Sequence, residues 1–285
     1  MRVQRIAERI IRVEDIHDFN LLKTMRSGQS FRWMVSDGLV YCITGDNVVR
    51  LKQKQDGSLV VAASEEEWER VWKTYFDLDH DYSQDAFAKI DQTEVEKRIC
   101  NVGRGIHILK QDPWEVLASF IITQNCHVSR ARKIVGELCN RYGTEITNTD
   151  LGVKFKTFPS PAEILKHGDD IARMGIGYRD YYLLSAAECV DSGIVPLRSL
   201  HLCNDTRLKQ VLERIVGVGP MISNSVALFA YQRRSAVPID MWVEYALIYL
   251  LGGGISLRKY GDLAGLMQQY IYYYVREGAY LPENR

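Results

Sequence analysis

The spacing of apolar residues changes near residue 65, and this change most constrains how the chain can fold. Before it, short runs of partly alternating apolar residues are separated by turn sequences, at residues 31–35, 39–44, 47–53 and 58–63. After it, apolar residues recur at helical spacing, as in Val71, Trp72, Tyr75 and Phe76. The pattern predicts an α+β fold. We expect a small N-terminal antiparallel β-sheet domain with flanking helices over residues 1–92, and a mostly α-helical domain over residues 93–285.

Several helix ends are marked by capping residues. Asp112 and Ser160 each precede a proline and stand three residues before a glutamate, which is typical of a helix N-terminus. Ser129 is predicted to cap a further helix, which Gly143 ends.

Composition restricts the function. The six cysteines are scattered without a CxxC pair, which argues against zinc or an iron–sulfur cluster and for reduced thiols. The N-terminus mixes charged with apolar residues and no apolar run approaches the ~20 residues of a membrane span, so we expect an intracellular protein without a membrane partner. The formal net charge is zero, which argues mildly against nucleic acid, although Arg130, Arg132 and Lys133 form a local basic cluster.

A glycine-rich hairpin stands between two amphipathic segments, at Gly217-Val218-Gly219 before Pro220. Free backbone N–H groups at the start of the second helix, together with its dipole, can hold a DNA phosphate without reading sequence. Glycine allows the close approach, and proline suits the first helical turn. An ordinary interhelical turn explains the local sequence equally well.

Asp240 follows Val237-Pro238-Ile239 and precedes an apolar helix. One interpretation is an N-cap. The other is a carboxylate in a cleft, which stabilises positive charge developing on a sugar or orients an attacking water.

In combination, these features resemble the helix-hairpin-helix DNA glycosylases, and the rest of the chain resembles their 8-oxoguanine DNA glycosylase family in particular. Similar motifs occur in the family's order over nearly the whole chain, at residues 27–33, 75–79, 109–115, 158–160, 175–179, 217–219 and 237–240. The resemblance implies a helix-hairpin-helix glycosylase domain that flips a damaged base out of double-stranded DNA and reads the orphaned cytosine.

The resemblance also implies roles for single residues. Cytosine would be read by Asn125, Arg130 and Arg179, whose donors and acceptors suit its edge. The lesion pocket would be formed by Gly28, Ser225, Gln268 and Tyr272, with Ser225 standing where the family has cysteine. For Arg130 and Arg179 the alternative is a solvated helix face, and for Gln268 and Tyr272 it is a core role in a tyrosine-rich helix.

The sequence departs from the family around the catalytic lysine, whose position is occupied by Met221. That lysine attacks the sugar and forms a Schiff base, which permits strand cleavage. Methionine cannot form an imine, so lyase chemistry at this position is excluded. Lys209 is the nearest lysine in the preceding helix. Cys126, His127 and residues 222–224 also differ from the family pattern.

Two functions therefore compete. Asp240 and the retained cytosine readers favour a glycosylase for 8-oxoguanine opposite cytosine that hydrolyses with water, as monofunctional members of the superfamily do. The changes around Met221 favour a lesion- or modified-base-binding protein without catalysis, and Ser225 leaves a changed base specificity open. The resemblance implies a monomer that acts on DNA in the nucleoid or nucleus, without a cofactor.

Overall fold

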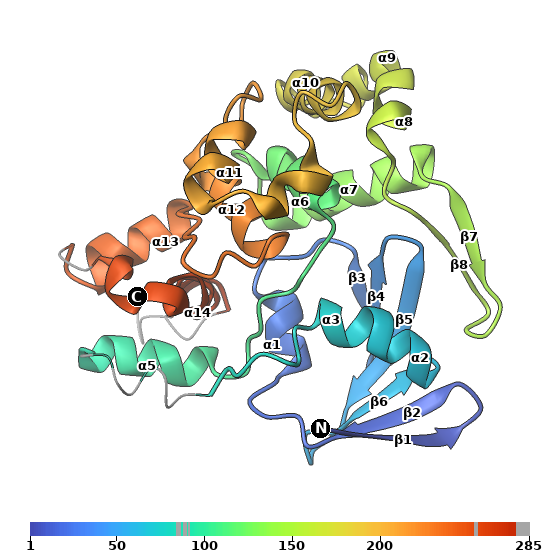
Figure 1. Ribbon diagram of the computed structural model, residues 1–285, viewed down its shortest axis with the longest axis vertical. Coiled ribbons are helices and arrows are strands. Elements are labelled where there is room, and N and C mark those ends of the chain that lie inside the picture. The colour runs from blue at the N-terminus through green and yellow to red at the C-terminus, as the bar shows by residue number, and fades with distance from the viewer. Residues whose placement is uncertain (84–86, 88–89, 91, 254–255, 278–285) are drawn as a thin grey trace, which may run out of the picture. The chain divides into compact units, whose positions relative to one another are not determined.

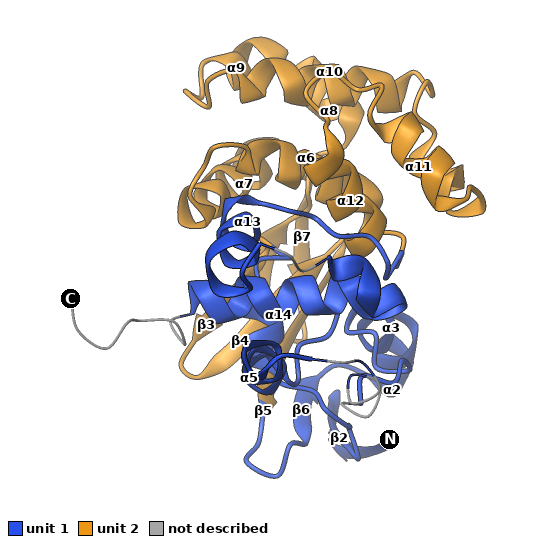
Figure 2. Ribbon diagram, turned by 90° about the vertical axis from the view of Figure 1, so that its left-hand side faces the viewer, with its two compact units in different colours: residues 1–30, 53–110, 232–285 blue, residues 31–52, 111–231 orange. Residues whose placement is uncertain are grey.

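The computed structural model describes residues 1–83, 87, 90, 92–253 and 256–277 (Figure 1). The last residues of the predicted helical domain, 278–285, lie outside the described residues. The chain forms two compact units (Figure 2), each composed of separate segments. Unit 1 contains residues 1–30, 53–110 and 232–285, and unit 2 contains residues 31–52 and 111–231.

Unit 1 contains antiparallel strands that pair in the order β1-β2-β6. Their bounds are β1 Arg2–Ala7, β2 Ile10–Glu14 and β6 Leu59–Ala62. Ile11 and Val13 alternate with half-buried residues and are themselves buried, so one face of β2 packs on the core. The sequence analysis missed the β1–β2 hairpin, because charged residues interrupt its apolar pattern.

Helices make up most of the rest of unit 1. Trp68, Trp72, Phe76 and Tyr270 are among its largest fully buried side chains and form its core. The described helices are α1 Leu21–Arg26, α2 Glu65–Glu67, the π-helical η1 Trp68–Trp72, α3 Lys73–Tyr75, α5 Glu94–Gly103, α13 Met241–Tyr245, the π-helical η3 Ala246–Leu250, the 3-10 helix η4 Leu257–Leu263 and α14 Ala264–Arg276.

Unit 2 combines two small antiparallel β elements with helices. Strands β3 Trp33–Ser36, β4 Leu39–Thr44 and β5 Asn47–Gln53 pair in succession, and the register places Trp33 opposite Cys42. A second hairpin joins β7 Glu145–Asn148 to β8 Val153–Lys156. Strands β3 to β6 agree closely with the predicted runs, whereas β7 and β8, short strands within a helical region, were not predicted.

The helices of unit 2 confirm most of the predicted ends. They are α6 Pro113–Thr123, α7 Val128–Tyr142, α8 Pro161–Lys166, α9 Gly168–Ala172, α10 Arg179–Asp191, the 3-10 helix η2 Leu197–Leu202, α11 Asp205–Leu212 and α12 Pro220–Phe229. Asp112 and Ser160 cap α6 and α8, and Gly143 ends α7, as predicted. The prediction for Ser129 is wrong: His127 is the N-cap of α7, and its side chain accepts from the Ser129 amide.

The predicted fold class is therefore confirmed: antiparallel strands near the N-terminus are followed by mostly helical structure. Neither compact unit is one continuous stretch of the sequence, because each is assembled from separate segments. Each unit contains both strands and helices. The domain boundary after residue 92 stays a prediction. All six cysteines are free thiols. No helix among the described residues is long and apolar enough to cross a membrane.

Candidate active site

The predicted hairpin lies between α11 and α12 of unit 2. Its two glycines differ in whether their surroundings have room for a side chain. Gly217 has a φ of +83°, and a Cβ added to it would collide with the ring of Tyr182. Gly219 is the N-cap of α12, and a Cβ there would meet nothing within 4 Å. Packing of the described residues thus requires Gly217 but not Gly219, and space is open beside Gly219 at the N-terminus of α12.

Side-chain bonds hold the two hairpin helices together. The hydroxyl of Ser223 on α12 donates to the carboxylate of Glu213, at the end of α11, over 2.6 Å. Lys209 on α11 lies 3.5 Å from the side-chain oxygen of Asn224. Asn224 follows Met221 by three residues in α12, so the nearest lysine reaches the helix of Met221 and contacts the amide of a neighbouring side chain.

Met221 occupies the first turn of α12, where its side chain is half-buried. The hydroxyl of Ser225, one turn later, lies 2.9 Å from the Met221 carbonyl oxygen and 3.7 Å from its sulfur. The structure thus places Ser225 and Met221 side by side, as their spacing predicts. Neither side chain provides an amine, and the thioether is a weak acceptor only.

The predicted cytosine readers meet around residues 175–179 of unit 2. Arg130 is exposed and lies 3.4 Å from the Gly175 carbonyl oxygen. The amide nitrogen of Asn125 donates to the hydroxyl of Tyr178 over 2.9 Å. Asn125 itself has a left-handed backbone, with φ of +46°, at the turn between α6 and α7. Asparagine tolerates this conformation better than most residues do.

Arg179 has a different environment from Arg130, because it is only 8% exposed. Its guanidinium donates to three carbonyl oxygens: those of Gln124 at 2.7 Å, Asn125 at 2.8 Å and Ile176 at 2.8 Å. In this structure Arg179 therefore shapes the turn that carries Asn125. The side chain of Gln124 in turn donates to the Gly217 carbonyl over 2.8 Å, which links this turn to the hairpin.

Sequence reasoning missed Tyr178. Its ring lies 5.1 Å from the Arg179 guanidinium carbon, its hydroxyl accepts from Asn125, and 44% of the residue is exposed. The signal was present in the Gly175-Ile176-Gly177-Tyr178-Arg179 motif, where an aromatic residue directly precedes the predicted arginine.

Asp240 belongs to unit 1, where it caps α13. Its Oδ1 accepts from the amides of Trp242 and Val243 at 3.0 and 2.9 Å, so the N-cap interpretation is correct geometrically. Burial raises the pKa of the Asp240 carboxyl above its ordinary value, although these amide bonds and the charge of Arg276 oppose the rise. A partly desolvated carboxylate of this kind is typical of functional sites, and capping does not exclude a second role.

Gly28 and Tyr272, both in unit 1, are in direct contact. Gly28 has a φ of +81°, and a Cβ added to it would lie 2.6 Å from an edge carbon of the Tyr272 ring. Burial raises the pKa of Tyr272 to about 12. Gln268 stands one turn before Tyr272 on α14 and is 3% exposed, and its side-chain oxygen accepts from Gln269 over 2.9 Å. The structure thus brings these three predicted pocket residues together, whereas Ser225 belongs to unit 2.

Arg276, one turn after Tyr272, is a second residue that sequence reasoning missed. It lowers the pKa values of both Asp240 and Tyr272 through its charge, and its guanidinium carbon lies 5.2 Å from the centre of the Trp242 ring. The spacing of Gln268, Tyr272 and Arg276 at four-residue intervals would have identified one face of α14.

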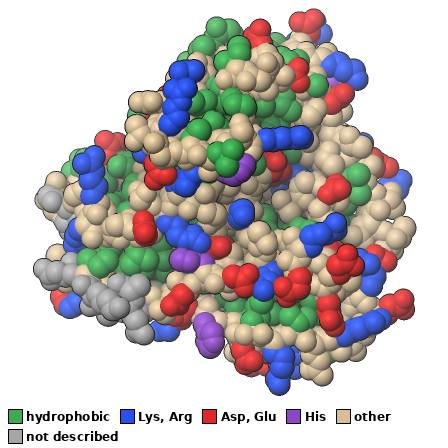
Figure 3. Space-filling model, viewed as in Figure 1, with side chains coloured by type: hydrophobic (Ala, Val, Ile, Leu, Met, Phe, Trp, Pro, Cys, Tyr) green, Lys and Arg blue, Asp and Glu red, His purple; other side chains and the backbone are tan. Residues whose placement is uncertain are grey.

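Electrostatics outside these sites are mixed. Figure 3 shows acidic and basic side chains interspersed over the face it presents, in agreement with a formal net charge of zero. A glycine hairpin with open space beside Gly219, a turn with exposed polar side chains and a partly buried carboxylate are the features expected of a helix-hairpin-helix DNA glycosylase.

Comparison with known proteins agrees with this class. Residues 11–117 match the N-terminal domain of 8-oxoguanine DNA glycosylase. MBOgg1, solved with a low-affinity DNA ligand, is 33% identical, with a TM-score of 0.87 over 97% of this chain and 99% of its own. The Clostridium acetobutylicum 8-oxoguanine glycosylase/lyase, solved with DNA containing cytosine opposite 8-oxoguanine, is 29% identical, with a TM-score of 0.88 over 98% and 99% of the two chains. The chain belongs to the 8-oxoguanine DNA glycosylase family.

A curated relative extends beyond the part that matches. The Saccharomyces cerevisiae N-glycosylase/DNA lyase is 29% identical over 265 residues, which cover 79% of this chain and 66% of the yeast protein. The aligned part of this chain thus spans about two thirds of that relative.

Proposed function

We propose that this chain is a monofunctional DNA glycosylase that flips oxidised guanine out of a duplex opposite cytosine and releases it by hydrolysis. Asp240 would carry the reaction, and Met221 would exclude the lyase step. The protein would act as a monomer on damaged double-stranded DNA in the nucleoid or nucleus. The Clostridium relative, solved on this lesion and this opposite base, supports the substrate.

The observation that carries this proposal is the state of Asp240. Its bonds to the Trp242 and Val243 amides are both made to Oδ1, so neither of these two bonds occupies Oδ2, the atom we assign to a sugar or a water. Cleavage of the glycosidic bond creates positive charge on the sugar, and a nearby carboxylate stabilises that charge most strongly where water is scarce. The partial burial that raises the pKa of Asp240 provides this environment.

Met221 separates this chemistry from that of a lyase. A lyase needs an amine that attacks the sugar and becomes a Schiff base. Met221 has none, and Lys209, the lysine nearest to it in sequence, lies 3.5 Å from the side-chain oxygen of Asn224. Hydrolysis needs only a water at the sugar and a carboxylate to assist it, so the loss of the amine leaves this route open.

A lesion-binding protein without catalysis is the second candidate. The half-buried thioether of Met221 beside the hydroxyl of Ser225 favours it, since both residues differ from the family where the lesion and its sugar would lie. In this case the turn of Asn125 and Arg179 would still read the opposite cytosine.

One experiment separates the candidates. Purified protein in excess is incubated with an end-labelled duplex that carries 8-oxoguanine opposite cytosine, and half of each sample is then treated with hot alkali. We expect strand breakage only after alkali, because base release leaves an intact abasic strand. Breakage without alkali would reveal an amine nucleophile and contradict the monofunctional assignment. An unbroken strand together with a lesion-specific band shift would establish the binding protein.

A further inference from the structure

A cavity of about 620 Å³ lies within unit 2, remote in sequence from the hairpin, and none of the roles described above uses it. It is lined by residues of β3, β4 and β5, by one face of α7 and by β8. Apolar side chains such as Phe31, Ile43, Val48 and Phe155 contribute to its lining. The volume falls within the range of small-molecule sites, which is roughly 300–1,000 Å³.

The charged side chains that line this cavity are all basic among the described residues. Its lining contains several cations and no carboxylate: Arg32, Arg132, Lys133, Lys154 and Lys156. Arg32 is neutralised by the buried Glu115 at 3.0 Å, and Lys154 and Lys156 share Glu145 at 3.1 and 3.8 Å. Within the described part of the chain, Arg132 and Lys133 form no ion pair. The cavity therefore has two uncompensated positive charges on one helix.

Arg132 is held in place without an anion. Its guanidinium carbon lies 4.3 Å from the centre of the Trp33 ring, and one of its terminal nitrogens donates to the Trp33 carbonyl oxygen. Burial lowers the pKa of the Arg132 guanidinium. A partly buried cation that is fixed by a ring and a carbonyl retains donors for an anion and loses little entropy on binding one.

Gly136 keeps the cavity open at its helical wall. It lies in the middle of α7, where glycine costs up to about 1 kcal/mol of helix stability relative to alanine. A Cβ at Gly136 would meet nothing within 4 Å, so the packing of the described residues does not require glycine. A missing side chain in a cavity wall, at a position where neighbours do not demand it, is consistent with space kept for a ligand.

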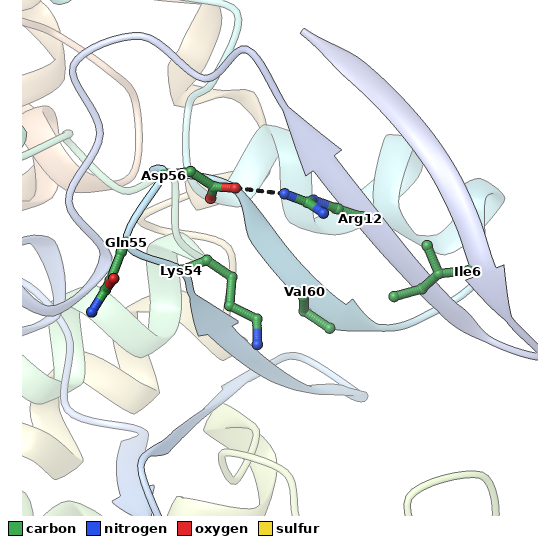
Figure 4. Close-up of a pocket in the computed structure, with 6 residues that line it drawn as sticks. All are labelled: Ile6, Arg12, Lys54, Gln55, Asp56 and Val60. Carbon is green, nitrogen blue, oxygen red and sulfur yellow. Dashed lines mark hydrogen bonds and ion pairs between the residues drawn. The ribbon is translucent and has the colours of Figure 1, made fainter.

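The pocket in Figure 4 differs from this cavity in its ion pairing and in its lining side chains. It lies in unit 1 and is lined by Ile6, Arg12, Lys54, Gln55, Asp56 and Val60. There the side chains of Arg12 and Asp56 point toward one another and pair at 2.5 Å, so the arginine is neutralised by the pocket's own carboxylate. That pocket contains no aromatic side chain.

We propose that the cavity of unit 2 binds a nucleoside monophosphate. The phosphate would pair with Arg132 and Lys133, because these cations lack carboxylate partners. The base would lie among aromatic side chains, which include Trp33, Tyr41 and Phe155. The exposed amide of Asn140 provides a donor and an acceptor for the base edge. The ligand could be a free nucleotide or one nucleotide unit of a DNA strand, since both offer the same groups.

Calorimetric titration of the full chain with guanosine 5′-monophosphate tests this proposal. We expect saturable binding, with guanosine and inorganic phosphate each at least about 10-fold weaker because each offers only part of the contacts. Lys133→Ala should weaken nucleotide binding at least about 10-fold, because a charge-assisted bond is lost. Arg141→Ala is the matched control: Arg141 lies on the same helix outside the cavity and should leave binding unchanged.

A second pair of variants tests the space itself. Gly136→Leu should abolish nucleotide binding by filling the cavity, whereas Gly136→Ala should retain it and raise the thermal stability of α7. Displacement of bound nucleotide by an undamaged duplex would identify the DNA strand as the source of the ligand. Retention would identify a free nucleotide. No saturable binding, or equal affinities for Lys133→Ala and Arg141→Ala, would overturn the proposal.

Discussion

Gly28 lies against the ring of Tyr272 so closely that a Cβ at Gly28 would be 2.6 Å from an edge carbon of that ring. This contact joins the segment after α1 to α14. It also limits the space beside the Tyr272 ring, which the family resemblance assigns to the lesion pocket. The chain thus has no room for a side chain at this glycine.

Gly28→Ala should therefore impair lesion processing. The added methyl must displace Tyr272, and alanine must adopt a φ of +81°, so we expect a loss of about 1–3 kcal/mol of unfolding free energy. Denaturant unfolding and single-turnover base release measure the two effects. Gly38→Ala, in an open turn with a φ of +71°, is the control for backbone strain alone. Equal base release by both variants would remove Gly28 from the pocket.

Met221→Lys should introduce lyase activity. The new amine would stand in the first turn of α12, one turn before Ser225, and could form a Schiff base with the sugar. Borohydride trapping on a duplex with 8-oxoguanine should then yield a covalent complex, whereas we expect none with the parent protein. Lys209→Ala in the same background should leave trapping intact. An untrapped Met221→Lys variant would mean that the surrounding pocket differs from that of the family.

Asp240→Asn should reduce base release by on the order of 10²–10⁴-fold while lesion binding persists. Asparagine caps helices as well as aspartate does, so α13 should remain folded. Asp240→Ala instead removes the cap and should cost about 1 kcal/mol of stability. Comparison of the two variants by single-turnover kinetics and thermal unfolding separates catalysis from capping. Undiminished release by Asp240→Asn would assign Asp240 a capping role only.

The pH dependence follows from the raised pKa of Asp240. Only the carboxylate stabilises positive charge, so base release should fall as pH decreases through this raised pKa, above the ordinary value of about 3.9. The contribution of Asp240 to folding stability has the opposite pH dependence. The protonated carboxyl is favoured in the folded state, and its contribution is present at low pH and lost as pH rises through the folded pKa. The stability gained by Asp240→Asn should therefore be larger at pH 7 than at pH 4, in thermal unfolding at both values.

Arg130→Ala and Arg179→Ala should both weaken the preference for cytosine opposite the lesion, with different effects on stability. Arg130 is exposed, so its loss should leave the unfolding temperature unchanged. Arg179 makes three bonds to carbonyl oxygens, and its loss should cost about 2–3 kcal/mol. Base release opposite each of the four bases and thermal unfolding measure both. A preference for cytosine that survives both changes would refute the reader assignment.

Local sequence signals predicted the fold where they were strong. The β3 to β6 strands and the ends of α6 and α8 follow from turn residues, caps and prolines that act within a few positions. The β1–β2 and β7–β8 hairpins were missed because their polar, short strands are stabilised by partners that local periodicity does not reveal. At α7 a histidine took the capping role expected of Ser129, since its ring accepts the same amide bond.

Motifs led to predicted site residues, but they did not predict the environments of those residues. The resemblance identified Arg179, yet its burial under three carbonyls depends on the folded turn of Asn125 and Ile176. The pKa of Asp240 depends on burial and on Arg276, which is distant in sequence. Tyr178 and Arg276 act through contacts with predicted residues, and such contacts exist only once the chain has folded.

Arg179 donates to the Gln124 carbonyl, and the Gln124 side chain donates to the Gly217 carbonyl. These two hydrogen bonds connect the hairpin to the turn of Asn125. A displacement of the Gly217 backbone would be transmitted through these two hydrogen bonds to the turn that presents Asn125. Binding of a DNA phosphate at the hairpin and recognition of the opposite base at the Asn125 turn would then be coupled. Substitution of Gln124 would remove the bond to the Gly217 carbonyl and should make the two events independent.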